Sequence, residues 1–229
     1  MTDPSKFGLN VLFEDNHILV LNKRASDISQ GDKTGDESLP EKIQAYWKEK
    51  FNKPGKVYCG VVHRLDRPTS GVIIYTKTSK ALERMFVQFK AKTIKKTYWA
   101  VVETKPPKKK DTLIHFMTRK EKINKSYAND IELTGSKKAI LHYEWVKSSD
   151  KYHLLQINLE TGRHHQIRSQ LSKMGMTIKG DLKYGASRSN KDKSIHLHAR
   201  KIVFMHPTTK EEMTVVAPVP NDPLWKFFE

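Results

Sequence analysis

The segment from Val61 to Tyr75 constrains the fold of this chain more than any other. A short β-branched run, Val61-Val62, precedes the polar stretch His63-Arg64-Leu65-Asp66-Arg67. A Pro-Thr-Ser-Gly turn and a second apolar run, Val72 to Tyr75, follow it. A strand, a tight turn and a second strand in this order hold a polar side chain at the rim of a rigid sheet. The sequence therefore predicts that Asp66 lies at such a rim.

Asp66 stands between two arginines, Arg64 two residues before it and Arg67 directly after it. A neighbouring positive charge favours the ionised form of a carboxyl group. Asp66 is therefore suited to act as a nucleophile or a charge anchor, and less suited to act as a general acid. The alternative is a surface salt bridge in a loop, which is the more common role of an isolated Arg-x-Asp-Arg.

The charge of the chain points to a polyanionic partner. Its 229 residues contain 42 lysines and arginines against 25 aspartates and glutamates, which gives a net charge of +17. An excess of this size must either repel itself or meet a polyanion, and nucleic acid is the commonest polyanion in a cell. Ribosome binding, RNA modification and DNA binding all remain open on charge alone.

Cysteine content and the N-terminal sequence indicate the cellular compartment. Cys59 is the only cysteine, so an intramolecular disulfide and a cysteine-based metal site are excluded. The first residues lack the apolar core of a signal peptide, and no apolar run is long enough to span a membrane. We expect a cytoplasmic protein without membrane contact.

The chain contains several closely spaced histidines that could suggest a metal site, but their spacing does not favour one. No His-Glu-x-x-His pattern is present, and no second cysteine supports a ligand cluster. His196 and His198 fall on one face of an alternating strand expected over 195–204, where structural or RNA-facing histidines are more common. We expect no metal site among the candidates, which are His164, His165, His196, His198 and His206.

Hydrophobic periodicity predicts a mixture of strands and helices. The N-terminal half should contain two strands around the acidic turn Glu14-Asp15-Asn16, then a helix capped by Ser38 with Glu41 completing a capping box. A second, basic helix follows the Asp66 motif. The apolar residues expected to pack into the core from these two helices are Ile43, Tyr46, Trp47 and Phe51, then Leu82, Met85, Phe86 and Phe89.

The C-terminal half should contain further strands over 95–103, 139–146, 152–159 and 213–217. The lysine-rich segment 104–138 reads as a mobile, solvated loop, for which phosphate contact and simple solvation are equally plausible. A helix should follow the strand over 152–159, with Arg163 at its start and Ile167, Leu171 and Met174 on its buried stripe. Gly175 should cap that helix, and the tail should dock through Leu224, Trp225 and Phe227.

Three segments carry a resemblance to a known family. They are His63-Arg64-Leu65-Asp66 with Thr69-Ser70-Gly71, then Lys96-Thr97-Tyr98, and the stretch from Glu160 through Arg168 to Gly180-Asp181. Together they resemble the signature of the large pseudouridine synthase family whose members modify ribosomal or transfer RNA. The chain departs from the family pattern at Arg24 after Asn22-Lys23, at Glu103-Thr104 after the second segment, and at Met176-Thr177-Ile178 before the Gly-Asp pair.

The resemblance implies a role for individual residues. Asp66 would be the catalytic residue, Tyr98 would lie against the target base, and Arg168 would pair with Asp66. The flanking residues expected to bind RNA are Arg64, Arg67, Arg163 and His165. No metal or organic cofactor is implied. Whether the aspartate attacks the sugar or removes a proton from it to give a glycal stays open.

The resemblance also implies a fold and an activity. The fold would be α+β, a mixed and largely antiparallel sheet with helices on its faces and a central RNA-binding cleft. Residues 1–229 would form a single catalytic domain and a monomer, with no small RNA-binding domain in front. The activity would be isomerisation of specific uridines in structured RNA to pseudouridine, with base flipping and an aspartate nucleophile. Alternatives are a noncatalytic RNA- or ribosome-binding protein on the same scaffold and, more weakly, a metal-dependent nuclease.

Overall fold

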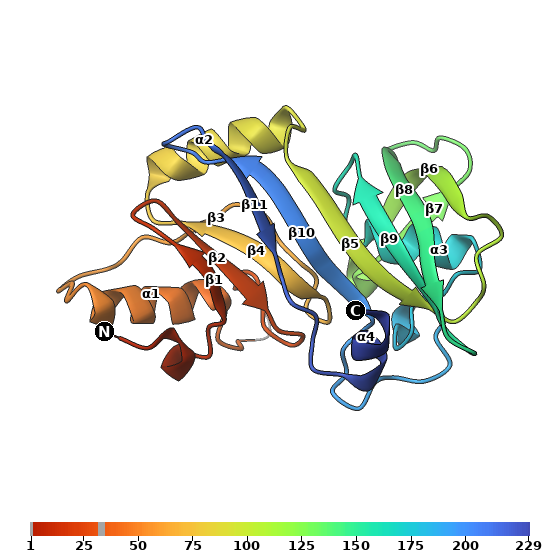
Figure 1. Ribbon diagram of the computed structural model, residues 1–229. Coiled ribbons are helices and arrows are strands. Elements are labelled where there is room, and N and C mark those ends of the chain that lie inside the picture. Colours follow the sequence, from red (N-terminus) through yellow and green to blue (C-terminus); the bar gives the residue numbers. More distant parts are fainter. Residues whose placement is uncertain (1, 32–34) are drawn as a thin grey trace. The chain divides into compact units, whose positions relative to one another are not determined.

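The computed structural model describes residues 2–31 and 35–229. The chain forms two compact units, unit 1 with residues 1–94 and 199–220, and unit 2 with residues 95–198 and 221–229. Antiparallel strand pairs with helices packed beside them make up each unit (Figure 1). The α+β class with a mixed, mostly antiparallel sheet is therefore confirmed.

Unit 1 is built on strand β4, whose side chains are all buried and which lies between β2 and β10. The acidic turn between the first two strands forms as the sequence predicts, because the Asp15 carboxylate accepts the amide N–H groups of His17 and Ile18, each at 2.7 Å. The strands of this unit are β1 (Val11–Glu14), β2 (Ile18–Lys23), β3 (Gly60–Val61), β4 (Ser70–Thr76), β10 (Leu197–Met205) from its third residue onward, and β11 (Glu212–Val216). A 3-10 turn, η1 (Pro4–Phe7), precedes them.

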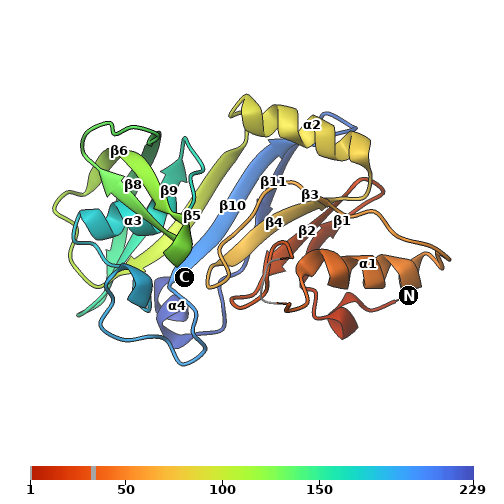
Figure 2. The same ribbon diagram turned by 180° about the vertical axis from the view of Figure 1, so that it is seen from behind.

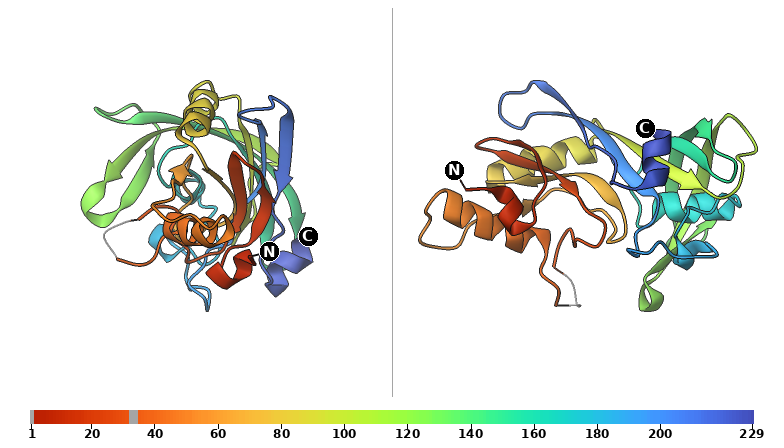
Figure 3. Two further views of the ribbon diagram at one scale, coloured as in Figure 1. Left: turned by 90° about the vertical axis from the view of Figure 1, so that its left-hand side faces the viewer. Right: turned by 60° about the horizontal axis from the view of Figure 1, so that its bottom comes forward.

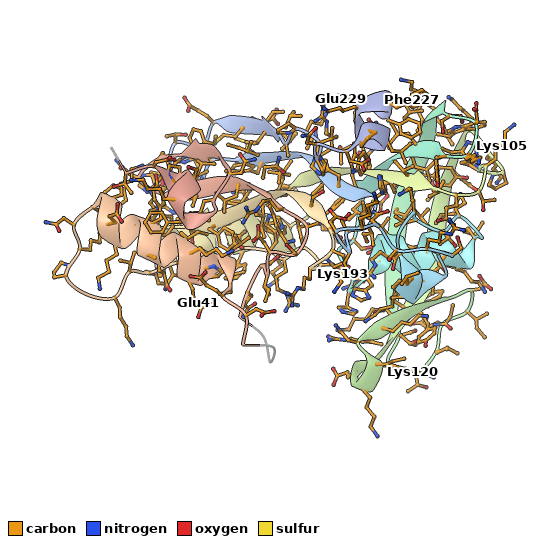
Figure 4. All side chains as sticks on the ribbon, turned by 90° about the horizontal axis from the view of Figure 1, so that it is seen from below. Glu41, Lys105, Lys120, Lys193, Phe227 and Glu229 are labelled. Carbon is orange, nitrogen blue, oxygen red and sulfur yellow. The ribbon has the colours of Figure 1, made fainter. Side chains whose placement is uncertain are left out.

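Helix α1 (Leu39–Lys50) begins at the predicted capping box. The Ser38 amide donates to the Glu41 carboxylate at 2.7 Å, and Glu41 lies at the start of the helix in Figure 4. Ile43, Tyr46 and Trp47 are buried as expected. The expectation for Phe51 is wrong: the helix ends one residue before it, and its side chain is 43% exposed.

Helix α2 (Ser79–Lys90) buries a narrower stripe than the sequence suggested. Ala81 and Met85 are buried, whereas Phe86 is 48% exposed, so its assignment to the core is wrong. Successive helical residues are about 100° apart, which turns Phe86 away from the face that holds Met85. The helix is tied to β10 through Gln88, whose side-chain amide donates to the Met205 carbonyl at 2.8 Å.

Unit 2 contains five antiparallel strands in the order β5-β9-β8-β6-β7 among the described residues. The expected loop over 104–138 is wrong, because this segment contains a long hairpin, residues 110–129, seen in green in Figure 3. Leu113, His115 and Met117 alternate inward along β6, and intervening polar residues hid this alternation. The strands are β5 (Lys95–Val102), β6 (Lys110–Lys120), β7 (Lys125–Asn129), β8 (Lys137–Ser148) and β9 (His153–Leu159).

The turn of this hairpin, η2 (Glu121–Ile123), follows Lys120, which lies at the outer end of the hairpin in Figure 4. Helix α3 (Gln166–Lys173) packs on the sheet face of unit 2, as Figure 2 shows from behind. The Gln170 side-chain amide donates to the Leu113 carbonyl on β6 at 3.1 Å, which fixes that packing.

The ends of α3 differ in part from expectation. The helix begins at Gln166, so Arg163 precedes it by three residues instead of opening it. Gly175 ends it with a φ of +73°, as predicted, but Met174 is 38% exposed and does not belong to the buried stripe. The 3-10 turn η3 (Leu182–Tyr184) follows.

The C-terminal helix α4 (Pro223–Phe228) docks through Trp225 and Phe228, which are buried. Phe227 is 47% exposed, so the expectation that it docks is wrong. His196 is structural, because its ring stacks on Trp225 with 5.2 Å between centroids and its Nε2 lies 3.1 Å from the Asp222 carboxylate. Across residues 2–31 and 35–229, no helix is both long and apolar enough to traverse a bilayer.

Candidate active site

The Asp66 turn, residues 63–70, leads from β3 into β4 in unit 1. The Thr69 amide donates to the Asp66 carbonyl at 3.0 Å and closes the turn. Gly71 follows with a φ of +115°, and a Cβ at that position would lie 2.4 Å from the backbone oxygen of Ala199 on β10. Only glycine allows both this backbone conformation and this approach, so β4 starts at a fixed place next to the turn.

The backbone before Asp66 is anchored by Ser29. The Ser29 hydroxyl donates to the Leu65 carbonyl at 2.8 Å and receives the Leu65 amide at 3.1 Å. Tyr75 on β4 in turn donates its hydroxyl to the Ser29 carbonyl at 2.9 Å. Asp66 itself is half-buried, so part of its surface stays open.

Lys23 anchors the backbone after Asp66. Its side chain is fully buried at the end of β2, and its ammonium donates to the carbonyls of Arg24 at 2.9 Å, Arg67 at 3.1 Å and Thr69 at 2.8 Å. An ammonium has three N–H donors, so these three acceptors use all of them. Lys23 therefore ties Arg67 and Thr69, in the second half of the turn, to the end of β2.

Two opposing effects set the charge state of Lys23. Burial lowers its pKa to about 7, and the negative charges of Asp27 and Asp66 act in the opposite direction. The three carbonyl acceptors also favour the ammonium, because a neutral amine would lose one of the three donors. Sequence reasoning did not assign Lys23 a role, although a lysine two positions after the apolar run 18–21 was a usable signal.

The other residues of the Asp66 turn have separate contacts. The Nε2 of His63 accepts the Ile74 amide at 3.1 Å and its ring packs on Phe89, with 5.3 Å between centroids. Arg64 is exposed. Arg67 pairs with Asp36 at 2.7 Å, and both of these side chains are about half exposed.

Arg168 on α3 is the centre of a buried polar cluster in unit 2. Its Nε and one terminal nitrogen donate to the two oxygens of Asp181 at 2.7 and 2.8 Å, and both side chains are almost fully buried. Its guanidinium lies 5.0 Å from the centre of the Tyr184 ring. Such a bidentate pair fixes the plane of the guanidinium. The resemblance included Asp181 in the third segment without a role, and a buried arginine's need for a carboxylate could have supplied one.

The loop before α3 carries the remaining predicted residues. His165 is buried with a left-handed φ of +51°, its Nδ1 lies 3.0 Å from the Tyr184 hydroxyl, and its ring stacks on His164 at 3.8 Å. Arg163 is exposed and donates from Nε to the Lys138 carbonyl at 3.1 Å. The loop thus presents Arg163 outward and His165 inward.

Tyr98 lies on β5 opposite Ile157 of β9 and is 8% exposed. It therefore belongs to the sheet face on which α3 packs, since Ile157, Tyr143 and the β6 residues paired with β8 alternate onto the same face. Within the described residues, no group of three or more histidine, cysteine or acidic side chains is arranged to hold a metal ion.

A family model described as RNA pseudouridylate synthase matches residues 17–173 of the chain. The RNA pseudouridine synthase YhcT of Bacillus subtilis is 34% identical over 222 residues, covering 96% of this chain and 71% of that protein. The chain belongs to the RNA pseudouridine synthase family. It is accordingly an isomerase that converts uridine in RNA to pseudouridine, as the motifs predicted.

Two further similarities are consistent with this assignment. Ribosomal large subunit pseudouridine synthase D of Zymomonas mobilis is 28% identical over 230 residues, covering 96% of this chain and 72% of that protein. The solved structure of human RNA pseudouridylate synthase domain containing 4 superposes with a TM-score of 0.80 at 19% identity, covering 98% of this chain and 94% of that one. At that identity the second likeness shows a shared fold. The matched range 17–173 includes Asp66, Tyr98 and Arg168.

Proposed function

We propose that this synthase modifies uridines in ribosomal RNA, with large-subunit RNA as the first candidate and transfer RNA as the second. Relatives named ribosomal large subunit pseudouridine synthases D and C support this choice. The net charge of +17 supports a large polyanionic substrate.

We assign Asp66 as the nucleophile, and the observation that carries this assignment is the anchoring of its turn. Ser29 holds the backbone on one side and Lys23 on the other, so the backbone that carries the carboxylate is held in place. A positioned carboxylate can attack C1′ of the ribose or stabilise positive charge on the sugar. Preorganisation of this kind is what a reaction without an outside energy source requires.

We assign Tyr98 to the target base and Arg168 to the charge balance of the site. An enzyme acting on a base takes it out of the helical stack and holds it against an aromatic side chain. Tyr98 supplies such a ring from a rigid strand, and Arg168 supplies a guanidinium whose orientation Asp181 fixes. Both side chains are held in fixed orientations, as a catalytic role requires.

We further assign RNA binding to four residues, three through direct contact and one through its conformation. The side chains of Arg64, Arg67 and Arg163 are exposed and can reach phosphates. Arg67 would exchange its partner Asp36 for a phosphate, and Arg163 would exchange the Lys138 carbonyl for one. His165 contributes by its buried, left-handed conformation, which shapes the loop that presents Arg163. We also propose that residues 1–229 work as one catalytic domain, as a monomer in the cytoplasm, which light scattering and fractionation test.

The deciding experiment uses unmodified ribosomal and transfer RNA transcripts that contain uridine with tritium at C5. Pseudouridine formation replaces the C5–H bond with a C5–C1′ bond, so turnover releases tritium to water. Wild-type protein should release it at specific positions. Asp66→Asn should keep RNA affinity while losing turnover by about 10⁴-fold or more.

Asp150→Asn is the matched control, because Asp150 is an exposed aspartate in the turn between β8 and β9. It should behave as wild type. Full activity in Asp66→Asn would remove the nucleophile assignment. Wild-type protein that binds these transcripts without releasing tritium would favour the noncatalytic RNA-binding alternative.

A further inference from the structure

Lys96 shares a strand and a sheet face with Tyr98. The two residues are separated by one position on β5, so their side chains project to the same side, about 7 Å apart along the strand. This is the face of the unit 2 sheet on which α3 packs. The neighbouring Lys95 projects to the opposite side and is exposed.

The Lys96 ammonium lies against the backbone of Gly162, in the loop that leads to Arg163 and α3. A Cβ added at Gly162 would lie 3.3 Å from the Lys96 nitrogen, which is closer than ordinary van der Waals contact. The side chain is half-buried, and burial lowers the pKa of Lys96 below its usual 10.5. Lys96 thus directs a partly desolvated positive charge toward the segment that carries the third motif.

The reaction produces a negative charge for which such a cation is suited. When the N1–C1′ bond breaks, its electron pair stays on N1, and the detached uracil becomes an anion with charge on its ring and carbonyl oxygens. With Asp66 as nucleophile, its carboxylate bonds to C1′ as N1 departs. The base then turns, C5 forms a bond to C1′ while the bond between Asp66 and C1′ breaks, the C5 proton leaves, and N1 takes up a proton. The products contain the same atoms and electrons as the substrate, and no other reactant is needed.

We propose that Lys96 is a further catalytic residue, whose ammonium faces the detached uracil beside Tyr98 and stabilises its negative charge. A fixed cation in a partly water-excluded site stabilises a developing anion without reorganising at the moment of reaction. The proposal rests on the proposed placement of the base at Tyr98. It adds to that placement the group that neutralises the leaving base.

The test measures single-turnover tritium release at saturating enzyme and, separately, RNA affinity by filter binding. Lys96→Met keeps the length of the side chain without its charge. It should lower the rate of tritium release from bound RNA by about 10²-fold, while RNA affinity stays close to wild type. Lys96→Arg should restore most of that rate. Gly162→Ala crowds the ammonium without removing it, so this variant should lose less of the single-turnover rate than Lys96→Met does.

Lys95→Met is the matched control from the same strand and should leave the rate and the affinity unchanged. A Lys96→Met variant with the wild-type rate would overturn the proposal. So would a variant that loses affinity alone, since this would make Lys96 a phosphate contact, or a Lys96→Arg variant as slow as Lys96→Met. If Asp66→Asn remains active or the wild-type protein releases no tritium, the proposed function fails instead, which the same assay distinguishes.

Discussion

Glu14 at the end of β1 offers the sharpest stability prediction, because four side chains donate to one carboxylate. Tyr46 and Trp47 of α1 donate at 2.8 and 2.9 Å, and Lys50 of the same helix donates at 2.6 Å. Lys77, just after β4, pairs at 2.8 Å with the carboxylate oxygen that also accepts from Trp47. Glu14 therefore joins α1 to the strands of unit 1.

The magnitude follows from the pKa of Glu14. Burial raises this pKa, but the hydrogen bonds from Lys50, Lys77 and Tyr46 outweigh burial and lower it from 4.5 to about 2. A pKa that is lower in the folded state stabilises the protein above pH 4.5, and this contribution is lost as the pH falls toward 2. The difference of 4.5 − 2 = 2.5 pKa units corresponds to about 3 kcal/mol at pH 7 and to about 1.4 kcal/mol at pH 3.

Glu14→Gln removes the charge and keeps the shape of the side chain. Urea denaturation from pH 3 to pH 7, followed by circular dichroism, should show the variant less stable by about 3 kcal/mol at pH 7, with about 2 kcal/mol of the difference gone at pH 3. Glu132→Gln, at an exposed glutamate of unit 2, should change the stability by less than about 0.5 kcal/mol. A Glu14→Gln difference that is independent of pH would refute the reasoning.

Two further predictions concern the groups that hold the site. Lys23→Met removes one hydrogen bond from each of three carbonyls, so the free energy of unfolding should fall by about 1–3 kcal/mol. Turnover should fall more than RNA affinity, and an unchanged turnover would show that the Asp66 turn does not need the Lys23 anchor. Asp181→Asn removes one charge of the buried bidentate pair with Arg168 and should cost about 3 kcal/mol in thermal unfolding. A melting temperature equal to wild type would contradict that assignment.

The local parts of the fold were predictable because their signals are local. The capping box of Ser38 and Glu41 and the acidic turn at Asp15 depend only on residues within three positions. The hairpin over 110–129 escaped prediction, since its buried positions include His115 and its exposed positions carry many charges. Its first strand, β6, also pairs with β8, which lies outside the hairpin.

The core assignments of Phe51 and Phe86 failed for a related reason. Helical periodicity gives the direction in which a side chain points, but the width of the buried stripe depends on what packs against the helix. In α2 that stripe is limited to the neighbourhood of Ala81 and Met85. The periodicity of one helix contains no information about the surface that packs against it.

The sequence alone determined the family, the reaction and the candidate residues Asp66, Tyr98 and Arg168, because motifs of fixed spacing depend on residue identity. Only the tertiary structure decided that Lys23 supports the Asp66 turn and that Asp181 orients Arg168. A buried charge is stable only beside its partners, and those partners come from segments that the chain brings together when it folds.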